Sequence, residues 1–437
     1  MAYLRITGPS RLHGEIIPQG AKNEAYQVLA AALLADAPVT IENVPDILDL
    51  QRFIQILKGL GCNIDQPTHH TYQIDPANVS PDFLADPEYQ QLGGSIRGSL
   101  MLLGPLLRRF HEIRIPRPGG DKIGRRRPDV HFEGLQRLGV EVIPHRTHYV
   151  VRRQGPLRGA FIYLSEPSVT GTANVMMAAA HAQGRTTIYN AACEPYIQQL
   201  GTMLQQMGVT IEGLGTNRII IEGTQRFNGV RHRCDPDMLE IGSFIGLAAI
   251  TDSDITIREA RIDKLGLIPQ AFERLGIQLE IGHDYIRIPP QGHYQIQSSI
   301  SGGIPTIYDA PWPGITPDLL SIILVVATQA KGNLLIHQKM FESRLFFVDH
   351  LIDMGAQIIL CDPHRAVVMG LDRQSPLYGI RMRSPDIRAG AALLIAAVAA
   401  EGESIIYNIE QIDRGYERID LKIRQLGGTI ERIMETE

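Results

Sequence analysis

The sequence predicts an α/β fold of two domains, each built from three related units. Three observations support this prediction. The chain has 437 residues, and two domains of roughly 200 residues each are expected at this length. A helix-like segment ending in Leu-Gly or Met-Gly and followed by a strand occurs six times. A further strand and apolar helix precede each of these endings. Since these repeats are longer than those of common solenoids, two closed domains of three units are favoured.

The six endings read LKGLGCNI, LQRLGVEV, LQQMGVTI, FERLGIQL, LIDMGAQI and IRQLGGTI, and their glycines follow one another at steps of 68 to 79 residues. A glycine just after a helix readily takes the left-handed conformation that other side chains disfavour. The pattern therefore predicts six helix C-termini, at Gly61, Gly139, Gly208, Gly276, Gly355 and Gly427.

A short strand is predicted before each of these helices, in APVTIEN, HEIRIPR, GRTTIYN, SDITIRE, GNLLIHQ and GESIIYN. The apolar helices that precede the strands are predicted to begin near Lys22, Gly94, Thr170, Met238, Pro317 and Asp386. In the C-terminal half they open with DPDMLEIG, TPDLLSII and SPDIRAGA, which are good helix starts. Asp237, Asp318 and Asp386 therefore have two interpretations. They complement helix dipoles, or the helix N-termini converge on one anion-attracting centre.

Composition limits the function classes. Hydrophobic residues make up 44% of the chain and charged residues 20%, as in an ordinary globular enzyme. The four cysteines form no CxxC pair, and the N-terminus lacks a signal-peptide pattern, so a reducing, cytoplasmic location is expected. The longest apolar run, AGAALLIAAVAA, is too short to span a bilayer. A net charge of −5 and 6% aromatic residues do not favour nucleic-acid binding, and the histidines show no metal-binding cluster.

One stretch, RPGGDKIGRRRPDVH (117–131), concentrates positive charge in a glycine-rich loop beside Asp121. Arginine binds phosphate and carboxylate through paired hydrogen bonds, and glycine lets the backbone approach an anion closely. A solvated turn is the alternative interpretation. Further basic and polar candidates stand at helix starts or in loops: Lys22, Asn23, Arg97, Arg126, Arg344, Arg388 and Arg414.

Together these residues belong to an ordered set of motifs that runs from end to end of the chain: GAKN, GGSIRGSLMLLGPLL, PGGDKIGRRRPDVH, TPDLLS, FESR, DIRAG and IDRGYERI. The set closely resembles the bacterial UDP-N-acetylglucosamine enolpyruvyl transferases of the EPSP synthase-like superfamily. The resemblance implies two inside-out α/β barrel domains, each of three βαβαββ-type repeats, with the active site in the cleft between them. One domain would span residues 22–235 and carry the Asp121 loop, and the other would combine residues 1–21 with 236–437.

The implied reaction transfers the enolpyruvyl group of phosphoenolpyruvate to the 3′-hydroxyl of UDP-N-acetylglucosamine, through a tetrahedral intermediate, and releases phosphate. It is the first committed step of peptidoglycan precursor synthesis. The resemblance implies no metal and no organic cofactor. No nucleic-acid or membrane partner is expected, and whether there is an obligate protein partner is unknown from the sequence.

The resemblance also implies roles for residues, with Lys22, Asp121, Asp318 and Arg414 as the catalytic ones. Asp121 would deliver the proton, Asp318 would act as the base for the hydroxyl, and Asn23 would contact the sugar. Arg344 and Arg388 would lie on the carboxylate side of phosphoenolpyruvate, and Met340 would be a further substrate contact. The phosphate of phosphoenolpyruvate would be held by Lys22, Arg126 and Arg414. The uridine diphosphate would be held by Arg97, Arg126, Arg127, Pro128, Asp129, Val130 and His131.

Three departures from the family pattern matter. Asp121 stands where most members carry cysteine, which implies resistance to the thiol-alkylating epoxide fosfomycin. Pro167 stands where well-known members carry a lysine that contacts the diphosphate, so transfer to another nucleotide such as UMP is an alternative, as is a non-catalytic paralogue. The segment HYQIQSSISGGIPTIYD (293–309) is expected to reshape part of the cleft.

Overall fold

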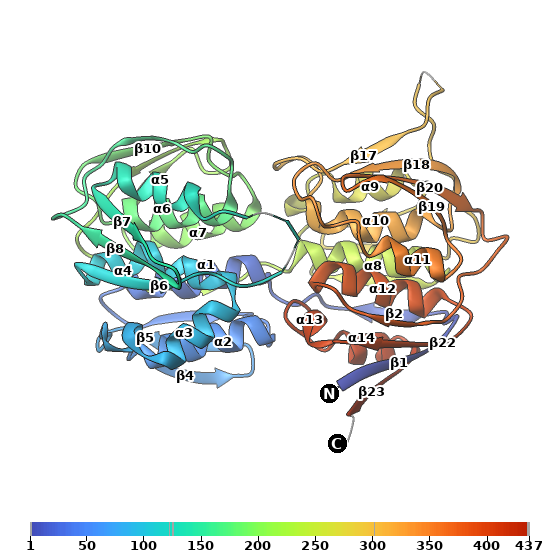
Figure 1. Ribbon diagram of the computed structural model, residues 1–437, viewed down its shortest axis with the longest axis horizontal. Helices are drawn as coiled ribbons and strands as arrows, with labels where there is room; N and C mark the ends of the chain where they lie inside the picture. The colour runs from blue at the N-terminus through green and yellow to red at the C-terminus, as the bar shows by residue number, and fades with distance from the viewer. Residues whose placement is uncertain (1, 122, 125, 301, 435–437) are drawn as a thin grey trace. The chain divides into compact units, whose positions relative to one another are not determined.

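The computed structural model describes residues 2–121, 123–124, 126–300 and 302–434. The chain divides into two compact units (Figure 1). Unit 1 contains Met1–Gln19, Asp121–Arg125 and Pro236–Glu437, and unit 2 contains Gly20–Gly120 and Arg126–Asp235. The segment of Asp121, which the sequence analysis assigns to the domain of residues 22–235, thus groups with unit 1. Arg125, the first of the three consecutive arginines in the predicted anion-binding loop, lies outside the described residues.

The described residues form six small sheets, and five of them share one arrangement. An edge strand runs parallel to its neighbour, and each of the next two strands is antiparallel to the one before it. Unit 2 has two such sheets, in spatial order β13 (Arg231–Arg233), β3 (Val39–Glu42), β5 (Thr71–Asp75) and β4 (Asn63–Thr68), and β9 (Phe161–Tyr163), β10 (Arg185–Tyr189), β12 (Arg218–Glu222) and β11 (Thr210–Glu212).

Unit 1 repeats this arrangement three times. Its sheets are β2 (His13–Ile16), β14 (Asp254–Arg258), β16 (Tyr285–Ile288) and β15 (Glu280–Ile281); β17 (Thr306–Tyr308), β18 (Lys331–His337), β20 (Arg365–Leu371) and β19 (Gln357–Asp362); and β21 (Arg381–Arg383), β22 (Gly402–Tyr407), β1 (Ala2–Gly8) and β23 (Thr429–Met434). In the last sheet β1 lies between the two C-terminal strands, where Leu4 pairs with Ile406 on one side and with Arg432 on the other.

The sixth sheet, in unit 2, consists of β6 (Glu112–Pro116), β8 (His148–Arg153) and β7 (Val140–Pro144), all antiparallel. All six predicted strands are therefore confirmed, as β3, β6, β10, β14, β18 and β22. The segment 293–309 ends in β17, the parallel edge strand that β9, β13, β2 and β21 provide in the other repeats.

The glycines that follow the second helix of each repeat confirm the predicted helix ends. All six have a positive φ, between 88° and 104°, in the region that glycine tolerates and other residues disfavour. The helices that precede them are α2 (Leu48–Gly59), α5 (Asp129–Arg137), α7 (Pro195–Gln206), α9 (Ile268–Glu273), α11 (Val348–Asp353) and α14 (Ile419–Gln425).

The first helices of the repeats form the interior of each unit: α1 (Lys22–Ala31) and α6 (Val169–Ala179) in unit 2, and α8 (Met238–Ile250), α10 (Leu320–Ala327) and α12 (Ile387–Ala399) in unit 1. Every residue of α8 and α10 is buried, as expected for helices that are apolar all round. In unit 1 these helices pack together with the sheets outside them, which confirms the inside-out arrangement (Figure 1). The packing is close, since a Cβ at Gly246 of α8 would overlap Ile322 of α10.

The helix predicted to begin near Gly94 begins elsewhere. α3 (Pro87–Ser95) starts earlier, where Asp86 caps it by accepting a hydrogen bond from the Glu88 N–H at 2.7 Å, and it ends one residue after Gly94. Ile96 is extended, and the chain continues as the 3₁₀ helix η3 (Arg97–Leu102) and then α4 (Leu103–Arg109). Two adjacent glycines are poor helix formers, so they lie near the end of a helix rather than at its start.

The remaining helical elements are short: the 3₁₀ turns η1 (Ala32–Leu34), η2 (Asp82–Ala85), η4 (Ile262–Lys264) and η5 (Pro317–Leu319), and the helix α13 (Glu410–Asp413). None of the helices within the described ranges has both the length and the apolar character that crossing a membrane requires.

Glu194, at the start of α7, should make stability depend on pH. Burial raises its pKa to about 7, although backbone hydrogen bonds at Glu194 and Cys193 oppose this. Because the pKa is higher in the folded than in the unfolded state, the fold favours the protonated acid. This contribution is present below about pH 4.5 and is lost as the pH rises to 7. Glu194→Gln should therefore stabilise the protein at pH 8 by on the order of 2 kcal/mol and have little effect at pH 4.5.

Urea unfolding at both pH values tests this expectation. The matched control is Glu212→Gln in β11, where the glutamate is exposed and the expected change is within about 0.5 kcal/mol. Equal stability of native protein and Glu194→Gln at pH 8 would contradict it.

Candidate active site

Lys22 begins α1 and is held in place by an ion pair within unit 2. Its Nζ lies 2.9 Å from Asp49 Oδ2, in the first turn of α2, and both side chains are nearly buried. Asn23 follows it, half-buried, in the same helical turn. The predicted pair of ligand residues thus stands at the N-terminus of a buried helix, where the helix dipole favours negative charge.

A buried pair that the sequence analysis missed anchors this helix start. Glu24 Oε1 lies 2.7 Å from Nε2 of His232 in β13, and Oε2 accepts a hydrogen bond from the Asp235 N–H at 3.1 Å. Asp235 O in turn accepts from the Ala21 N–H at 2.8 Å. Burial raises the pKa of Glu24 to about 7, while the contact with His232 opposes the shift. Glu24 stands in one helix with Lys22, Asn23 and Gln27, so its charge alone did not mark it in the sequence.

Cys234 completes a group that could hold a metal ion, since potential ligand atoms of Glu24, His232 and Cys234 all lie within 4.8 Å of one another. The carboxylate of Glu24 is already hydrogen-bonded through both oxygens. Burial raises the pKa of the Cys234 thiol well above its usual value, which disfavours the thiolate that metals bind. We therefore interpret this group as a hydrogen-bonded support for α1.

Arg97 and Arg126 lie together in unit 2. Arg97 Nη1 donates to the carbonyl oxygen of Arg126 at 3.0 Å. Burial and the neighbouring charge of Arg126 lower the pKa of Arg97 to about 10. Gly120, which has a φ of 100°, lies close against Arg97, because a Cβ at residue 120 would be 3.3 Å from the Arg97 Cβ. A largely desolvated guanidinium group that also feels the positive charge of a second arginine favours an anionic ligand.

His131 supports the start of α5 from inside. Its Nδ1 lies 2.7 Å from Asn174 Nδ2 and its Nε2 lies 3.1 Å from Thr170 Oγ1. Because Asn174 Nδ2 is a donor, Nδ1 accepts and Nε2 carries the proton. Burial and Arg97 lower the pKa of His131 to about 3, so the fully buried ring is neutral. The preceding residues differ in exposure: Arg127 and Asp129 are exposed, Pro128 is half-buried and Val130 is buried.

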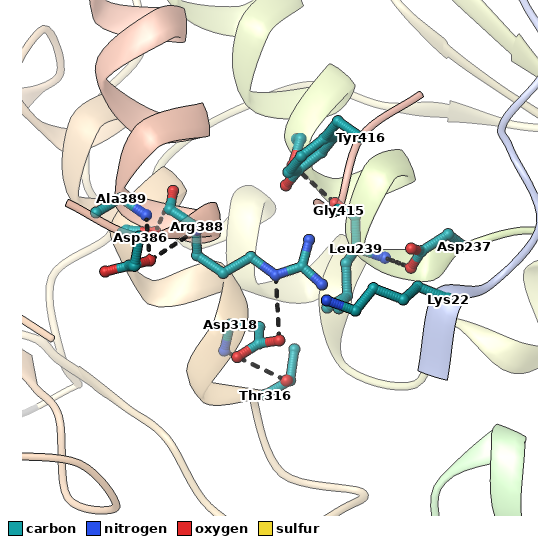
Figure 2. Close-up of polar contacts among 12 residues, drawn as sticks. Lys22, Asp237, Leu239, Thr316, Asp318, Asp386, Arg388, Ala389, Gly415 and Tyr416 are labelled. Atoms are coloured by element: carbon teal, nitrogen blue, oxygen red, sulfur yellow. Dashed lines mark hydrogen bonds and ion pairs between the residues drawn. The ribbon is translucent and has the colours of Figure 1, made fainter. Parts of the chain in front are cut away.

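Asp318 is the centre of the candidate site in unit 1 (Figure 2). Arg344 Nη2 donates to its Oδ1, and Arg388 Nε donates to its Oδ2 at 3.2 Å. Asp318 lies in η5, just before α10, and Arg388 lies in the first turn of α12. Both arginines are buried, whereas the Asp318 side chain is 22% exposed. A partly accessible carboxylate between two buried cations suits a base that acts on a bound ligand.

The two arginines have hydrogen-bonding capacity left over. Within the described part of the chain, Nε and Nη1 of Arg344 and Nη1 of Arg388 are buried nitrogens without a hydrogen-bond partner. An ion pair of Arg344 Nη1 with Asp386 Oδ1 is long, at 4.0 Å. Buried charged donors are costly to leave unpaired, so this cluster favours an additional anion.

The three aspartates at the helix starts of unit 1 serve different purposes. Asp237 accepts from the Leu239 N–H at 2.9 Å and so caps α8, and Asp386 caps α12 by accepting from Arg388 and Ala389 N–H groups at 2.8 and 3.0 Å. In η5 the cap is Thr316, whose Oγ1 accepts from the Asp318 N–H at 3.4 Å. The capping interpretation therefore holds for Asp237 and Asp386, while the Asp318 carboxylate is turned to Arg388 (Figure 2).

Asp121 also lies against an arginine of unit 1. Its Oδ1 accepts from Arg414 Nη1 at 2.7 Å, and the same nitrogen donates to Gln411 Oε1 at 2.7 Å. Both charged side chains are nearly buried. Gly120 and Gly124 on either side have φ of 100° and 125°, which only glycine adopts readily. The structure thus brings together two of the residues that the sequence analysis singled out as catalytic.

Met340 lies in the segment that follows β18 and is 42% exposed. The Lys339 ammonium before it lies 3.5 Å from the centre of the Tyr308 ring, a cation–π contact. Arg344 ends the same segment, so Met340 is joined to the Asp318 cluster through only a few residues of chain.

Comparison with known proteins gives a consistent result. A model of the family "EPSP synthase (3-phosphoshikimate 1-carboxyvinyltransferase)" matches residues 6–423. The chain is 54% identical over 434 residues to the UDP-N-acetylglucosamine 1-carboxyvinyltransferase of Porphyromonas gingivalis, covering 99% of this chain and 100% of that protein. It is 55% identical to the enzyme of the same name from Bacteroides fragilis, covering 99% and 100%, and 46% identical to that of Bradyrhizobium diazoefficiens, covering 98% of both.

Solved structures share the fold at lower identity. The enolpyruvyl transferase NikO from Streptomyces tendae superposes with a TM-score of 0.86 at 23% identity, over 100% of this chain and 99% of that one. An EPSP synthase from Acinetobacter baumannii gives 0.73 at 16% identity, over 99% and 100%.

Proposed function

This chain belongs to the EPSP synthase family, and from that premise we propose that it transfers the enolpyruvyl group of phosphoenolpyruvate to the 3′-hydroxyl of UDP-N-acetylglucosamine. Phosphate is released, and the product is the first dedicated precursor of peptidoglycan. Relatives that match over their whole length and carry this activity in their names support the assignment. We place the reaction in the cytoplasm.

The observation that supports the chemistry most directly is the position of Asp318 between Arg344 and Arg388. In our proposal the two guanidinium groups bind the carboxylate of phosphoenolpyruvate through their remaining N–H groups. The Asp318 carboxylate accepts the proton of the attacking sugar hydroxyl. The arginines orient Asp318 through hydrogen bonds to both of its oxygens, and a general base must be held in place before the reaction.

The addition step then balances as follows. The 3′-oxygen forms a bond to C2 of phosphoenolpyruvate, its proton passes to Asp318, and C3 takes a proton from Asp121. In the elimination step the bond between C2 and the phosphate oxygen breaks, the phosphate leaves with the proton held by Asp318, and C3 returns a proton to the Asp121 carboxylate as the double bond forms again. Fixed positive charge stabilises the phosphate throughout.

We assign the phosphate to Lys22, Arg126 and Arg414. Because Arg414 contacts Asp121 in this structure, an incoming phosphate would compete with Asp121 for the guanidinium group. That exchange would free the carboxyl group to carry the proton that C3 requires. Lys22 and Arg126 lie in unit 2 and Arg414 lies in unit 1.

We assign the sugar nucleotide to Asn23, Met340 and the loop before α5. Arg97 and Arg126 would face the diphosphate, where an anion relieves the repulsion between them. Arg127, Pro128, Asp129, Val130 and His131 would form the adjoining wall. The fully buried His131 ring would contribute by holding this wall in place.

Phosphate release tests the proposed function. With phosphoenolpyruvate as donor, we expect kcat/KM for UDP-N-acetylglucosamine to exceed that for UMP by at least about 100-fold, because UMP lacks the acceptor sugar and one phosphate. Shikimate 3-phosphate should give no release above background. Mass spectrometry of the product distinguishes transfer from hydrolysis. Preferred turnover of UMP would replace the proposed acceptor, and no turnover of any acceptor would indicate a non-catalytic paralogue.

A further inference from the structure

Asp309, at the end of β17, has a fully buried carboxylate for which the reaction described above gives no role. Its Oδ1 accepts from the Lys339 N–H at 2.5 Å. Its Oδ2 accepts from the Met340 N–H at 3.1 Å and from Gln338 Nε2 at 2.5 Å. Three donors from one short segment after β18 thus converge on the two oxygens of a single side chain.

The backbone of Asp309 is also part of the turn that leads to the proposed base. Asp309 forms a parallel bridge with Ile315, and the Ala310 N–H donates to Ile315 O at 3.0 Å. Thr316, which caps η5, and Asp318 follow directly. One residue therefore joins the turn before Asp318 to the segment after β18.

That segment, residues 338–344, touches Asp318 and the loop that carries Asp121. At its end Arg344 binds Asp318. The Ser343 N–H donates to Ile123 O, in the loop of Asp121, at 3.2 Å. Gly124 of the same loop lies against Glu342, where a Cβ would overlap the Glu342 carboxylate. A displacement of residues 338–344 would therefore reach the acid and the base together.

We propose that Asp309 is a positioning residue that fixes residues 338–344, and through them aligns the Asp121 loop and Asp318 for enolpyruvyl transfer. The proposal rests on the proposed function for its kinetic consequence but not for its structural one. A carboxylate is needed because each of its oxygens faces N–H donors. The amide of asparagine would place a donor of its own against one of them and leave a buried N–H unsatisfied.

The test compares Asp309→Asn with the native enzyme. Misplacement of reacting groups by about 1 Å costs on the order of 100-fold, so we expect kcat to fall by about 10- to 100-fold. We also expect KM for UDP-N-acetylglucosamine to rise about fivefold, because Met340 moves with the segment. The rise in KM is diagnostic, since a smaller folded fraction lowers kcat at unchanged KM. Amide hydrogen exchange of peptides that cover residues 338–344 should accelerate at least about tenfold.

Two further variants keep the test decisive. Asp254→Asn in β14, in another sheet of unit 1, is the matched control, because both oxygens of this carboxylate bind Arg287. The Asp254→Asn substitution should leave kcat and KM within about twofold of the native values. Gln338→Met removes one of the three donors and should change kcat, KM and hydrogen exchange in the same direction by a smaller amount. This variant replaces Asp309→Asn in the test if Asp309→Asn does not fold. Native kcat and KM in folded Asp309→Asn, or unchanged exchange, would overturn the proposal. If the native enzyme fails to turn over UDP-N-acetylglucosamine, the proposed function fails while the exchange measurement still decides the anchoring role.

Discussion

Asp318→Asn is expected to lower kcat by about 10³-fold while UDP-N-acetylglucosamine binds within roughly tenfold of its native affinity, because a base that acts only in the chemical step is lost. The asparagine amide has the same shape but cannot take the hydroxyl proton. It also leaves Arg344 and Arg388 without their shared anion. Phosphate release and equilibrium titration with the sugar nucleotide measure the two quantities separately.

Asp237→Asn provides the contrast for this prediction. Asp237 occupies the equivalent position at the start of α8 but caps its helix. Asparagine caps helices about as well as aspartate, so the expected loss of stability is below about 1 kcal/mol and turnover should stay near native. If Asp318→Asn kept more than a tenth of native kcat, the capping interpretation would extend to Asp318 and the base would have to be another group.

The native enzyme is expected to keep its activity after prolonged exposure to fosfomycin, and Asp121→Cys is expected to be inactivated in a time-dependent manner. Fosfomycin is an epoxide that alkylates thiolates, and a carboxylate is a far weaker nucleophile. A cysteine at this position would lie close to Arg414, whose charge favours the thiolate. Inactivation should accompany a mass increase of one inhibitor molecule, located on the peptide of residue 121.

The same position tests the proposed acid. Asp121→Asn should lose about 10²- to 10³-fold in kcat, since an amide cannot supply the proton for C3. Rapid covalent labelling of the native protein at Asp121 would contradict the resistance prediction. Near-native turnover of Asp121→Asn would show that Asp121 only caps the loop by binding Arg414.

Local patterns in the sequence were sufficient for the architecture because each repeat carries the same signals. The glycine after each second helix and the strand before that helix reflect backbone preferences that act within a few residues. The exception, the helix expected near Gly94, shows the limit of this reasoning. The cap at Asp86 and the break at Ile96 depend on individual residues rather than on hydrophobic periodicity.

The candidate site was predictable only in part, for a physical reason. Charged residues at helix starts and in glycine-rich loops are visible in the sequence, so Lys22, Asp121, Asp318 and Arg414 could be named as candidates. Supporting groups such as the Glu24–His232 pair join positions 208 residues apart, and no local pattern marks them. The role proposed for Asp309 likewise depends on donors in the segment that follows β18, about 30 positions away in the chain.

The position of β1 between β22 and β23 has a consequence for biosynthesis. All of unit 2 lies between residues 20 and 235, so the ribosome completes it while more than half of unit 1 is still to be made. The last sheet of unit 1 cannot form until residues 2–8 find partners some 400 positions later in the chain. Such distant pairings form slowly, and domains commonly fold as they emerge. The N-terminal strand must therefore wait, unpaired and prone to aggregate, until translation of the C-terminal strands is finished.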